Sequence, residues 1–252
     1  MLKKRIIPVQ LLMGDRLVKT TGFGTWRDVG DPVASSKVYA AQDADELVFL
    51  TISREDRTIQ PLLRVLERVS EVTFMPLALG GGIRSFEDAA LLIKHGADKV
   101  VVNSAVYEDP HLVRRIADAF GCQAVVVGID ARRTEGGVRL FTDCGRREQA
   151  VSLADHVRTV CAAGAGEILI QSIDRDGTMT GYDVGLIASV MEHARCPVIG
   201  LGGAGHYEHM KDAFVTTGCQ ALACGSLFNF GDNNPIRAKA FLSNHGLKFK
   251  VV

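Results

Sequence analysis

The sequence lacks an excess of charge of either sign, since 29 Lys and Arg balance 29 Asp and Glu in 252 residues. We therefore expect no broad basic surface and predict no nucleic-acid partner. No run of 18 apolar residues occurs, and no small-residue cleavage site follows the basic N-terminus. The sequence thus predicts neither a membrane span nor a signal peptide, and we expect a cytoplasmic protein.

Metal-binding patterns are also missing. The six cysteines form no CxxC pair, and no histidine cluster accompanies them. A zinc site is therefore not predicted, the thiols are expected to be reduced, and neither a metal nor an organic cofactor is expected. Cys144, in "FTDCGRRE", is the one cysteine expected near a functional site, but no histidine stands near it in sequence to activate a nucleophile.

What the sequence does contain is a regular alternation of short apolar runs and helical patterns, with 47% hydrophobic residues to build a core. The runs are rich in Val and Ile and do not alternate with polar residues, as expected for strands buried on both faces. Strands are predicted at 6–11, 46–51, 76–79, 99–102, 124–129, 167–171, 198–201 and 221–223. Helices are predicted at 32–42, 58–69, 86–95, 110–120, 150–163, 184–194, 207–216 and 235–244.

Eight βα units in one chain favour a (β/α)8 TIM barrel over a doubly wound open sheet. An internal repeat supports the barrel, because "LGGGI" at 79–83 matches "LGGAG" at 201–205, and "DELVFLTI" at 45–52 matches "GEILIQSI" at 166–173. We predict a single domain, residues 1–252, made of two duplicated half-barrels at about 1–122 and 123–252. The repeat pairs Leu11 with Asp130.

Glycine turns follow corresponding strands in the two halves. Glycine lets backbone N–H groups approach an anion closely, and barrel loops at the carboxyl ends of strands often bind phosphate. A single pair of glycines would indicate only a tight turn, but the duplicated arrangement favours two anion-binding corners and a ligand with a phosphate at each end. The expected corners contain Gly82, Asn103 and Ser104 in one half, and Gly203, Gly225 and Ser226 in the other. Asp176 and Gly177, in "SIDRDGT", could also meet a phosphate or a sugar hydroxyl, with a plain Asp/Gly turn as the alternative.

A carboxylate ends the fifth predicted strand, in "VVVGIDARR". Asp130 would be costly to bury there unless it is solvated or paired, so its position favours a catalytic acid or base. The alternative is a salt bridge to Arg132 or Arg133.

Charged residues begin four of the predicted strands, at the opposite end of the barrel. Strand phase predicts that two cations and two anions cluster there: Arg5, Glu46, Lys99 and Glu167. A stabilising role is usual for that face, and a pore closure or a partner surface is the alternative.

The segment 13–32 is long for a connection, contains four glycines and the only tryptophan, and is predicted to be a mobile lid. Lys19 within it is expected to reach an anionic substrate, with a solvated lysine as the alternative.

Taken together, these segments resemble the cyclase subunit of imidazole glycerol phosphate synthase, the HisF family, over essentially the whole chain. The resemblance rests on "KRII", "LVK", "GDPV", "DELVFL", "GGGI", "GADKVVVN", "QAVVVGIDA", "GAGEILIQSIDRDGT", "GGAG" and "EH". It implies a glutamine amidotransferase partner, a HisH-like glutaminase, which docks at the N-terminal face and sends ammonia through the barrel. It makes the four charged residues an ammonia gate, places Asp98 at the partner interface, and assigns phosphate binding to the two glycine corners.

The departures from the family lie mainly at the catalytic face. The family uses two carboxylates; Asp130 matches one, and Leu11 replaces the other. Further changes from the usual residues are Thr51, Cys144, Gln171 and Leu201. Leucine cannot transfer a proton, and each such group is worth about 10²–10⁴-fold in rate.

Three hypotheses follow from the resemblance and its departures. The first is a HisF-like subunit that receives ammonia for amidation of a nucleotide-activated sugar in surface polysaccharide synthesis, with a phosphorylated sugar-like ligand and a third, amide-forming protein. The second is a true cyclase of histidine biosynthesis, with Asp130 and Lys19 as catalytic residues. The third is a non-enzymatic scaffold that activates the glutaminase.

Overall fold

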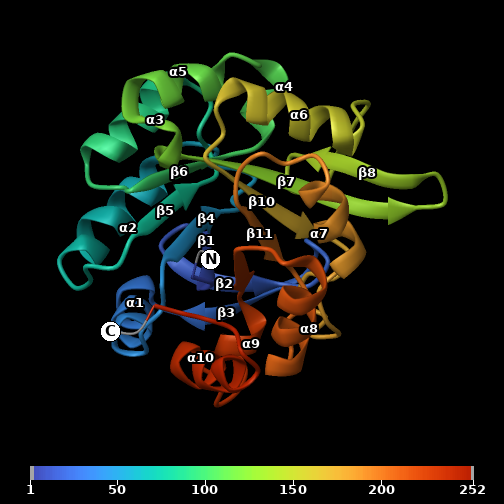
Figure 1. The fold of residues 1–252 in the computed structure, drawn as a ribbon. Coiled ribbons are helices and arrows are strands. Elements are labelled where there is room, and N and C mark those ends of the chain that lie inside the picture. The colour runs from blue at the N-terminus through green and yellow to red at the C-terminus, as the bar shows by residue number, and fades with distance from the viewer. Residues whose placement is uncertain (1–2, 251–252) are drawn as a thin grey trace.

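Eight parallel strands close into a barrel in the computed structural model, which describes residues 3–250 (Figure 1). They pair in a ring, each with the next and the last with the first. In ring order they are β1 (Arg5–Met13), β4 (Leu47–Thr51), β5 (Leu77–Gly80), β6 (Lys99–Val102), β7 (Val125–Thr134), β10 (Glu167–Ser172), β11 (Val198–Leu201) and β12 (Ala221–Cys224). The predicted (β/α)8 barrel is confirmed.

Helices pack around the outside of this barrel. The long ones are α1 (Pro32–Ala41), α2 (Gln60–Ser70), α3 (Phe86–Lys94), α5 (Leu112–Phe120), α6 (Leu153–Ala163), α7 (Val184–Met191), α8 (Tyr207–Thr217) and α10 (Pro235–Asn244). Side chains of Asp31, Ser85, Ser152, Asp183 and Asn234 cap the first turns of five of them. All eight predicted helices are confirmed within a few residues at each end.

Three short helices were not predicted. They are α4 (Ser104–Glu108), α9 (Ser226–Asn229) and the 3₁₀ turn η1 (Cys122–Ala124). Segments of three to five residues make little more than one turn, so no hydrophobic period marks them in the sequence.

The segment 13–32 is a hairpin rather than the predicted mobile loop. Strands β2 (Arg16–Thr20) and β3 (Trp26–Gly30) pair with each other, and β2 also pairs antiparallel with β1. Leu17 and Val18 are fully buried against the barrel, which fixes the hairpin in place. The charged residues within these strands and the glycines between them hid this structure from the sequence pattern.

A second hairpin extends from the opposite side of the barrel. Strand β7 continues into β8 (Gly137–Thr142) and β9 (Arg147–Gln149), and Figure 1 shows this ribbon projecting from the barrel. The two longest barrel strands, β1 with nine residues and β7 with ten, are thus the two that carry hairpins. They are also the first strands of the two predicted halves, whose boundary near residue 122 remains a prediction.

The barrel interior is a separate apolar core. Its buried residues come from inward-facing positions of the strands: Ile7, Val9, Leu11, Val18, Val48, Ala78, Val101, Val126, Leu169, Ile199, Leu201, Ala221 and Ala223. A larger core lies between the strands and the helices. The interior therefore forms an apolar layer between the polar groups at its two ends.

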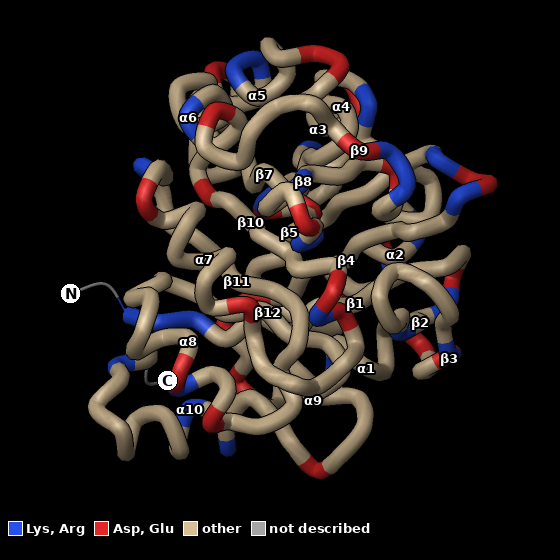
Figure 2. Tube along the Cα trace, turned by 90° about the vertical axis from the view of Figure 1, so that its right-hand side faces the viewer, with Lys and Arg blue, Asp and Glu red and all other residues tan. Residues whose placement is uncertain are grey.

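Charged residues are distributed over the periphery with both signs mixed in the view of Figure 2. This distribution agrees with the balanced composition. Among the helices of residues 3–250, none is both long and apolar enough to span a membrane.

Candidate functional site

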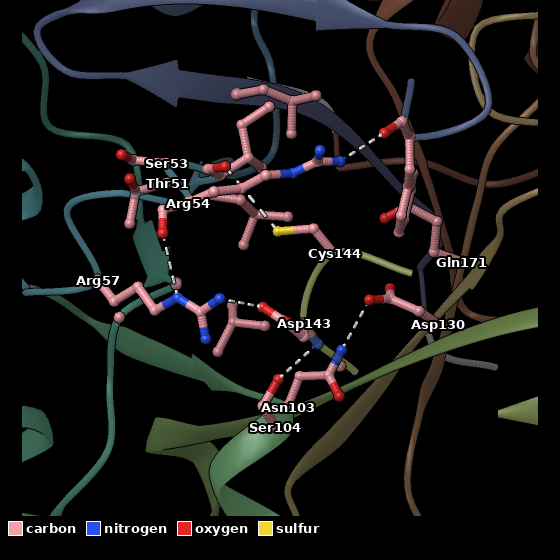
Figure 3. A pocket seen from close by; sticks show the side chains of 18 of the residues that line it. Thr51, Ser53, Arg54, Arg57, Asn103, Ser104, Asp130, Asp143, Cys144 and Gln171 are labelled. Carbon is pink, nitrogen blue, oxygen red and sulfur yellow. Dashed lines mark hydrogen bonds and ion pairs between the residues drawn. The ribbon is translucent and has the colours of Figure 1, made fainter. Parts of the chain in front are cut away.

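A cavity of about 950 Å³ opens at the carboxyl ends of β1, β4, β5, β6, β7 and β10 (Figure 3). Its lining brings together residues that lie far apart in the sequence: Leu11, Thr51, Gly82, Asn103, Ser104, Asp130, Cys144 and Gln171. This is the face where the enzymes of this fold place their active sites. The structure thus assembles the first predicted anion corner and Asp130 in one cavity.

The first corner combines a glycine turn with the start of a short helix. Gly82 has a φ of 73°, and a Cβ there would lie 2.5 Å from the Thr58 carbonyl oxygen, so only glycine fits. Helix α4 begins beside it, with Asn103 at the N-cap and no side chain capping the first turn. The first N–H groups of α4 therefore remain able to bind an anion.

The second corner borders a much smaller pocket that adjoins the large one, because Leu11 and Gln171 line both. Gly177, Gly203, Gly225 and Ser226 line a space of about 30 Å³, enough for roughly two water molecules. Lys19 fills the rest: its ammonium donates to the Val9 carbonyl and occupies the space where a Cβ on Gly225 would stand. The predicted residues of this corner do lie together, with the Lys19 ammonium among them, and an anion there would compete with the Val9 carbonyl for that ammonium.

Lys19 is therefore not on a mobile segment that reaches out to a ligand, as the sequence suggested. It lies on β2, is only 6% exposed, and points into the barrel. Burial lowers the pKa of its ammonium to about 8. The hairpin places this lysine at the second corner, so contact between Lys19 and an anionic substrate stays a prediction. The segment that carries it is a paired hairpin and not the loop expected from the sequence.

Asp176 positions the β2–β3 turn. Its carboxylate accepts hydrogen bonds from the Thr20 hydroxyl at 2.7 Å and from the Phe23 backbone N–H at 3.1 Å. Burial raises the pKa of this carboxyl. These two hydrogen bonds hold Asp176 to the β2–β3 hairpin. Contact between Asp176 and a phosphate stays a prediction.

Asp130 has the properties of a general acid or base. It lies at the mouth on β7 and accepts one hydrogen bond, from the Asn103 amide at 2.9 Å. Burial raises the pKa of its carboxyl to about 7, so both protonation states are populated at neutral pH. The alternative salt bridge is not formed, because Arg132 pairs with Asp174 and Arg133 with Asp183.

No second carboxylate faces Asp130 from β1. Leu11, which the sequence repeat pairs with Asp130, is 7% exposed and belongs to the apolar core of the barrel. Thr51 is buried on β4, and its hydroxyl has no hydrogen-bond partner. The central floor of the cavity therefore offers one titratable carboxylate where the resembled family has two.

Cys144 lies at the cavity wall, as expected, but without the surroundings of a nucleophile. Burial raises the pKa of its thiol, and no histidine lines the described cavity. In residues 3–250, no group of three or more His, Cys, Asp or Glu side chains is arranged to hold a metal ion.

The four charged strand-start residues form a closed ring at the other end of the barrel. Arg5 binds Glu46 at 2.9 Å and Glu167 at 2.5 Å, and the Lys99 ammonium lies 2.7 Å from each of the two glutamates. Burial raises the pKa of the Glu46 carboxyl. The predicted cluster is thus confirmed as a structure, and its role as a gate stays a prediction.

Asp98 lies beside this ring and is exposed. Its carboxylate accepts a hydrogen bond from the Leu77 backbone N–H at 2.8 Å. This position is compatible with the predicted partner interface, which nothing in the structure tests.

Two cavity residues were overlooked in the sequence. Arg54 and Arg57, in the loop between β4 and α2, line the mouth opposite Asp130. Arg57 pairs with Asp143 at 2.7 Å, and Arg54 donates to the Phe23 carbonyl at 3.1 Å. The signal was available, since "SREDR" directly follows a barrel strand at the face that binds ligands.

Comparisons with known proteins agree with the fold. A sequence model of the family described as "Histidine biosynthesis protein" matches residues 5–234. A protein of Hyphomonas neptunium named "Imidazole glycerol phosphate synthase subunit HisF" is 42% identical over 252 residues, which are the full length of both chains. A protein of Thermotoga sp. strain RQ2 with the same name is 43% identical over 251 residues, covering 100% of this chain and 99% of the relative.

These names favour the second of the hypotheses drawn from the sequence. Both relatives are named for imidazole glycerol phosphate synthase, and neither name refers to sugar amidation. The cyclase hypothesis thus has better support from the comparisons than the amidation hypothesis.

Replacing Asp130 by Asn should stabilise the protein at alkaline pH. The folded-state pKa of about 7 lies above the ordinary value of 3.8, so the stability linked to this carboxyl is complete near pH 4 and is lost as the pH rises through 7. In urea unfolding, the Asp130→Asn protein should match wild type below pH 4 and exceed its stability by at most about 4 kcal/mol at pH 8.5, since each pKa unit is worth about 1.4 kcal/mol. Asp118→Asn, at an exposed site, serves as control, and a difference that does not vary with pH would contradict the assignment.

Replacing Lys99 by Met should destabilise the charge ring. The two glutamates would then share only Arg5, and an uncompensated buried charge costs roughly 3 kcal/mol at pH 7. The loss should shrink at acidic pH, because burial raises the pKa of the Glu46 carboxyl and its protonation removes one of the two negative charges. Arg16→Met, which breaks an exposed pair with Asp28, should cost much less in the same urea titrations, because solvent screens that pair. Equal losses in the two variants would show that the ring is not strongly coupled.

Proposed function

The chain belongs to the histidine biosynthesis protein family, and on that premise we propose that it is a HisF-type synthase subunit of a glutamine amidotransferase complex. It takes ammonia from a HisH-like glutaminase at the N-terminal face and combines it with a phosphorylated substrate at the opposite mouth. Ring formation in histidine biosynthesis is the first candidate reaction, because both full-length relatives bear the name imidazole glycerol phosphate synthase.

The main support for this proposal is the order of charged, apolar and open layers along the barrel axis. A ring of four charged residues closes one end, an apolar layer follows, and a cavity of about 950 Å³ opens at the other end. Neutral ammonia crosses an apolar layer at far lower cost than ammonium, since burying an unpaired charge is expensive. This order of layers favours passage of ammonia from a partner to the mouth.

Asp130 is the group best suited to the proton transfers that the reaction needs. Its carboxyl titrates near pH 7, which is where a general acid or base is most effective. Asn103 holds the carboxylate from the side of the first anion corner. A substrate whose phosphate sits at Gly82, Asn103 and Ser104 would therefore place its neighbouring atoms beside Asp130.

Lys19 is the second proposed catalytic residue. With a pKa lowered to about 8, its ammonium can lose a proton more readily than an ordinary lysine. Its position at the second corner also supports a role in binding the far phosphate of a substrate, once the ammonium leaves the Val9 carbonyl.

A second candidate function is favoured by one specific residue. Leu11 leaves the mouth without the strand-one carboxylate, while the charge ring and the first anion corner are intact. This combination supports a subunit that delivers ammonia to a different acceptor, such as a nucleotide-activated sugar in surface polysaccharide synthesis, with a third, amide-forming protein at the mouth. The large cavity at the mouth counts against a purely non-enzymatic scaffold.

The shared part of both candidates predicts a complex with a HisH-like glutaminase. The two proteins should sediment together, and Lys99→Met should weaken glutamine-dependent synthesis more than synthesis supplied with ammonium chloride. The reason is that ammonium salts reach the mouth from solution and bypass the ring. Absence of a complex, or equal losses with both nitrogen sources, would refute the ammonia route.

The reaction itself is decided by a cyclase assay with Leu11→Asp. The complex is supplied with glutamine and the ribulosyl substrate of histidine biosynthesis, and imidazole glycerol phosphate is measured. If the missing carboxylate limits ring formation, Leu11→Asp should raise the rate at least about 10²-fold. Leu201→Asp, also at an inward-facing position of the barrel, is the matched control. Robust product formation by the wild type would establish the first candidate and exclude the second.

A further inference from the structure

Two cysteines from different elements meet at the N-terminal face of the barrel. Cys161 lies in the last turn of α6, and Cys196 lies in the loop between α7 and β11. Their sulfur atoms are 3.8 Å apart, within hydrogen-bond range for sulfur. Both residues are half-buried and neither is in a disulfide, so the pair is a dithiol that stays in contact with solvent.

The surroundings of Cys161 favour its thiolate. The Arg195 backbone N–H donates a hydrogen bond to the Cys161 sulfur at 3.4 Å. The hydrogen bond with Cys196, this N–H and the Arg195 charge lower the pKa of the Cys161 thiol, although partial burial opposes them. The same hydrogen bond and burial raise the pKa of the Cys196 thiol. One sulfur is thus suited to react with an oxidant, and its neighbour stays protonated beside it.

The other four cysteines do not share this arrangement. Within residues 3–250, no other two cysteine sulfurs lie within hydrogen-bond range of each other. Burial raises the pKa of the thiols of Cys144, Cys219 and Cys224. Cys122 is exposed in the turn η1, without a second thiol in contact. The pair of Cys161 and Cys196 is therefore distinguished by geometry as well as by acidity.

The pair lies next to the charge ring. The Glu167 carboxylate of the ring contributes to the raised pKa of the Cys196 thiol, which shows that the two are near each other. The residue after Glu167, Ile168, donates its backbone N–H to the Pro197 carbonyl at 3.0 Å. A bond between the two sulfurs would therefore join α6 to the start of β11 beside this ring.

We propose that Cys161 and Cys196 form a reversible redox site, in which a hydroperoxide oxidises Cys161 and Cys196 then closes a disulfide with it. The sulfurs must approach by roughly 2 Å to reach bonding distance, and the irregular loop that carries Cys196 can supply this movement. The inference concerns the N-terminal face and does not depend on the reaction at the mouth.

The chemistry takes place in two steps. The Cys161 thiolate attacks one oxygen of hydrogen peroxide, the O–O bond breaks, hydroxide leaves and Cys161 becomes a sulfenic acid. The Cys196 thiol then attacks that sulfur, the S–O bond breaks, and the disulfide forms as water leaves. In sum, two thiols and one peroxide give a disulfide and two waters, with two electrons passing from sulfur to oxygen. A dithiol reductant restores the two thiols by exchange.

Peptide mapping after mild oxidation tests the site in the full chain. The reduced protein is treated with an equimolar amount of hydrogen peroxide, blocked with N-ethylmaleimide and digested with trypsin without reductant. Trypsin releases Cys161 in peptide 159–175 and Cys196 in peptide 196–211, each without another cysteine. The two peptides should appear joined, lighter than their sum by two hydrogen atoms, and dithiothreitol should separate them.

Single substitutions assign the two roles. Cys196→Ser should stop the reaction at the sulfenic acid of Cys161, which dimedone traps in peptide 159–175. Cys161→Ser should leave Cys196 as a thiol under the same conditions. Cys122→Ser, which removes the exposed cysteine of η1, is the matched control and should form the joined peptides as the wild type does. Unchanged melting temperatures of the reduced variants would show that the fold is intact.

Alkylation by iodoacetamide at pH 7 gives an independent measure of the Cys161 thiolate. Cys161 should react at least about tenfold faster than Cys122. Cys196→Ala, which removes the hydrogen bond between the thiols, should slow Cys161 more than Cys196→Ser, which keeps a hydroxyl donor. Equal alkylation rates of Cys161 and Cys122, oxidation of other cysteines before this pair, or no joined peptides in the wild type would each overturn the proposal.

Discussion

Strand β1 pairs in parallel with both β4 and β12, and this double pairing closes the sheet so that no barrel strand has a free edge. Every other feature of the molecule depends on that closure. It forces alternate side chains of eight strands into one narrow interior, where they must be apolar or paired. It also brings all eight carboxyl ends to one face, so that residues as distant in sequence as Gly82 and Asp130 line a common cavity.

The two ends of the barrel handle charge in opposite ways. At the N-terminal end, Arg5 and Lys99 pair with two buried glutamates in a closed ring, which offsets part of the cost of desolvation, although Oε1 of Glu46 has no hydrogen-bond partner among the described residues. At the mouth, Asp130 has a single amide partner, and Arg54 has only a backbone carbonyl. A buried or titratable side chain without an ionic partner lowers stability, and such groups are concentrated at functional sites. The contrast therefore supports a structural role for the N-terminal end and ligand chemistry at the mouth.

Much of the architecture could be read from local patterns. Non-alternating Val and Ile runs located all eight barrel strands, and helix-period patterns located the eight long helices. The hairpins were missed because their strands carry charged residues in place of a continuous apolar run, as in "RLVKT" and "WRDVG". Lys19 was therefore expected on a mobile segment, although β2 places it inside the barrel. The two arginines of the loop after β4 were missed because a charged loop normally indicates only solvent exposure.

The sequence by itself determined the barrel, the family, the four members of the charge ring and the loss of a carboxylate at Leu11. The barrel and the members of the charge ring follow from residue type and strand phase, which are local properties of the chain, whereas the family and the carboxylate missing at Leu11 follow from the resemblance of its motifs to that family. Only the tertiary structure decided that the Lys19 side chain lies at the second glycine corner, and that the two corners border adjoining spaces that share Leu11 and Gln171. The physical reason is that burial, and with it the pKa of Asp130 and Lys19, depends on which distant segments the closed barrel brings together.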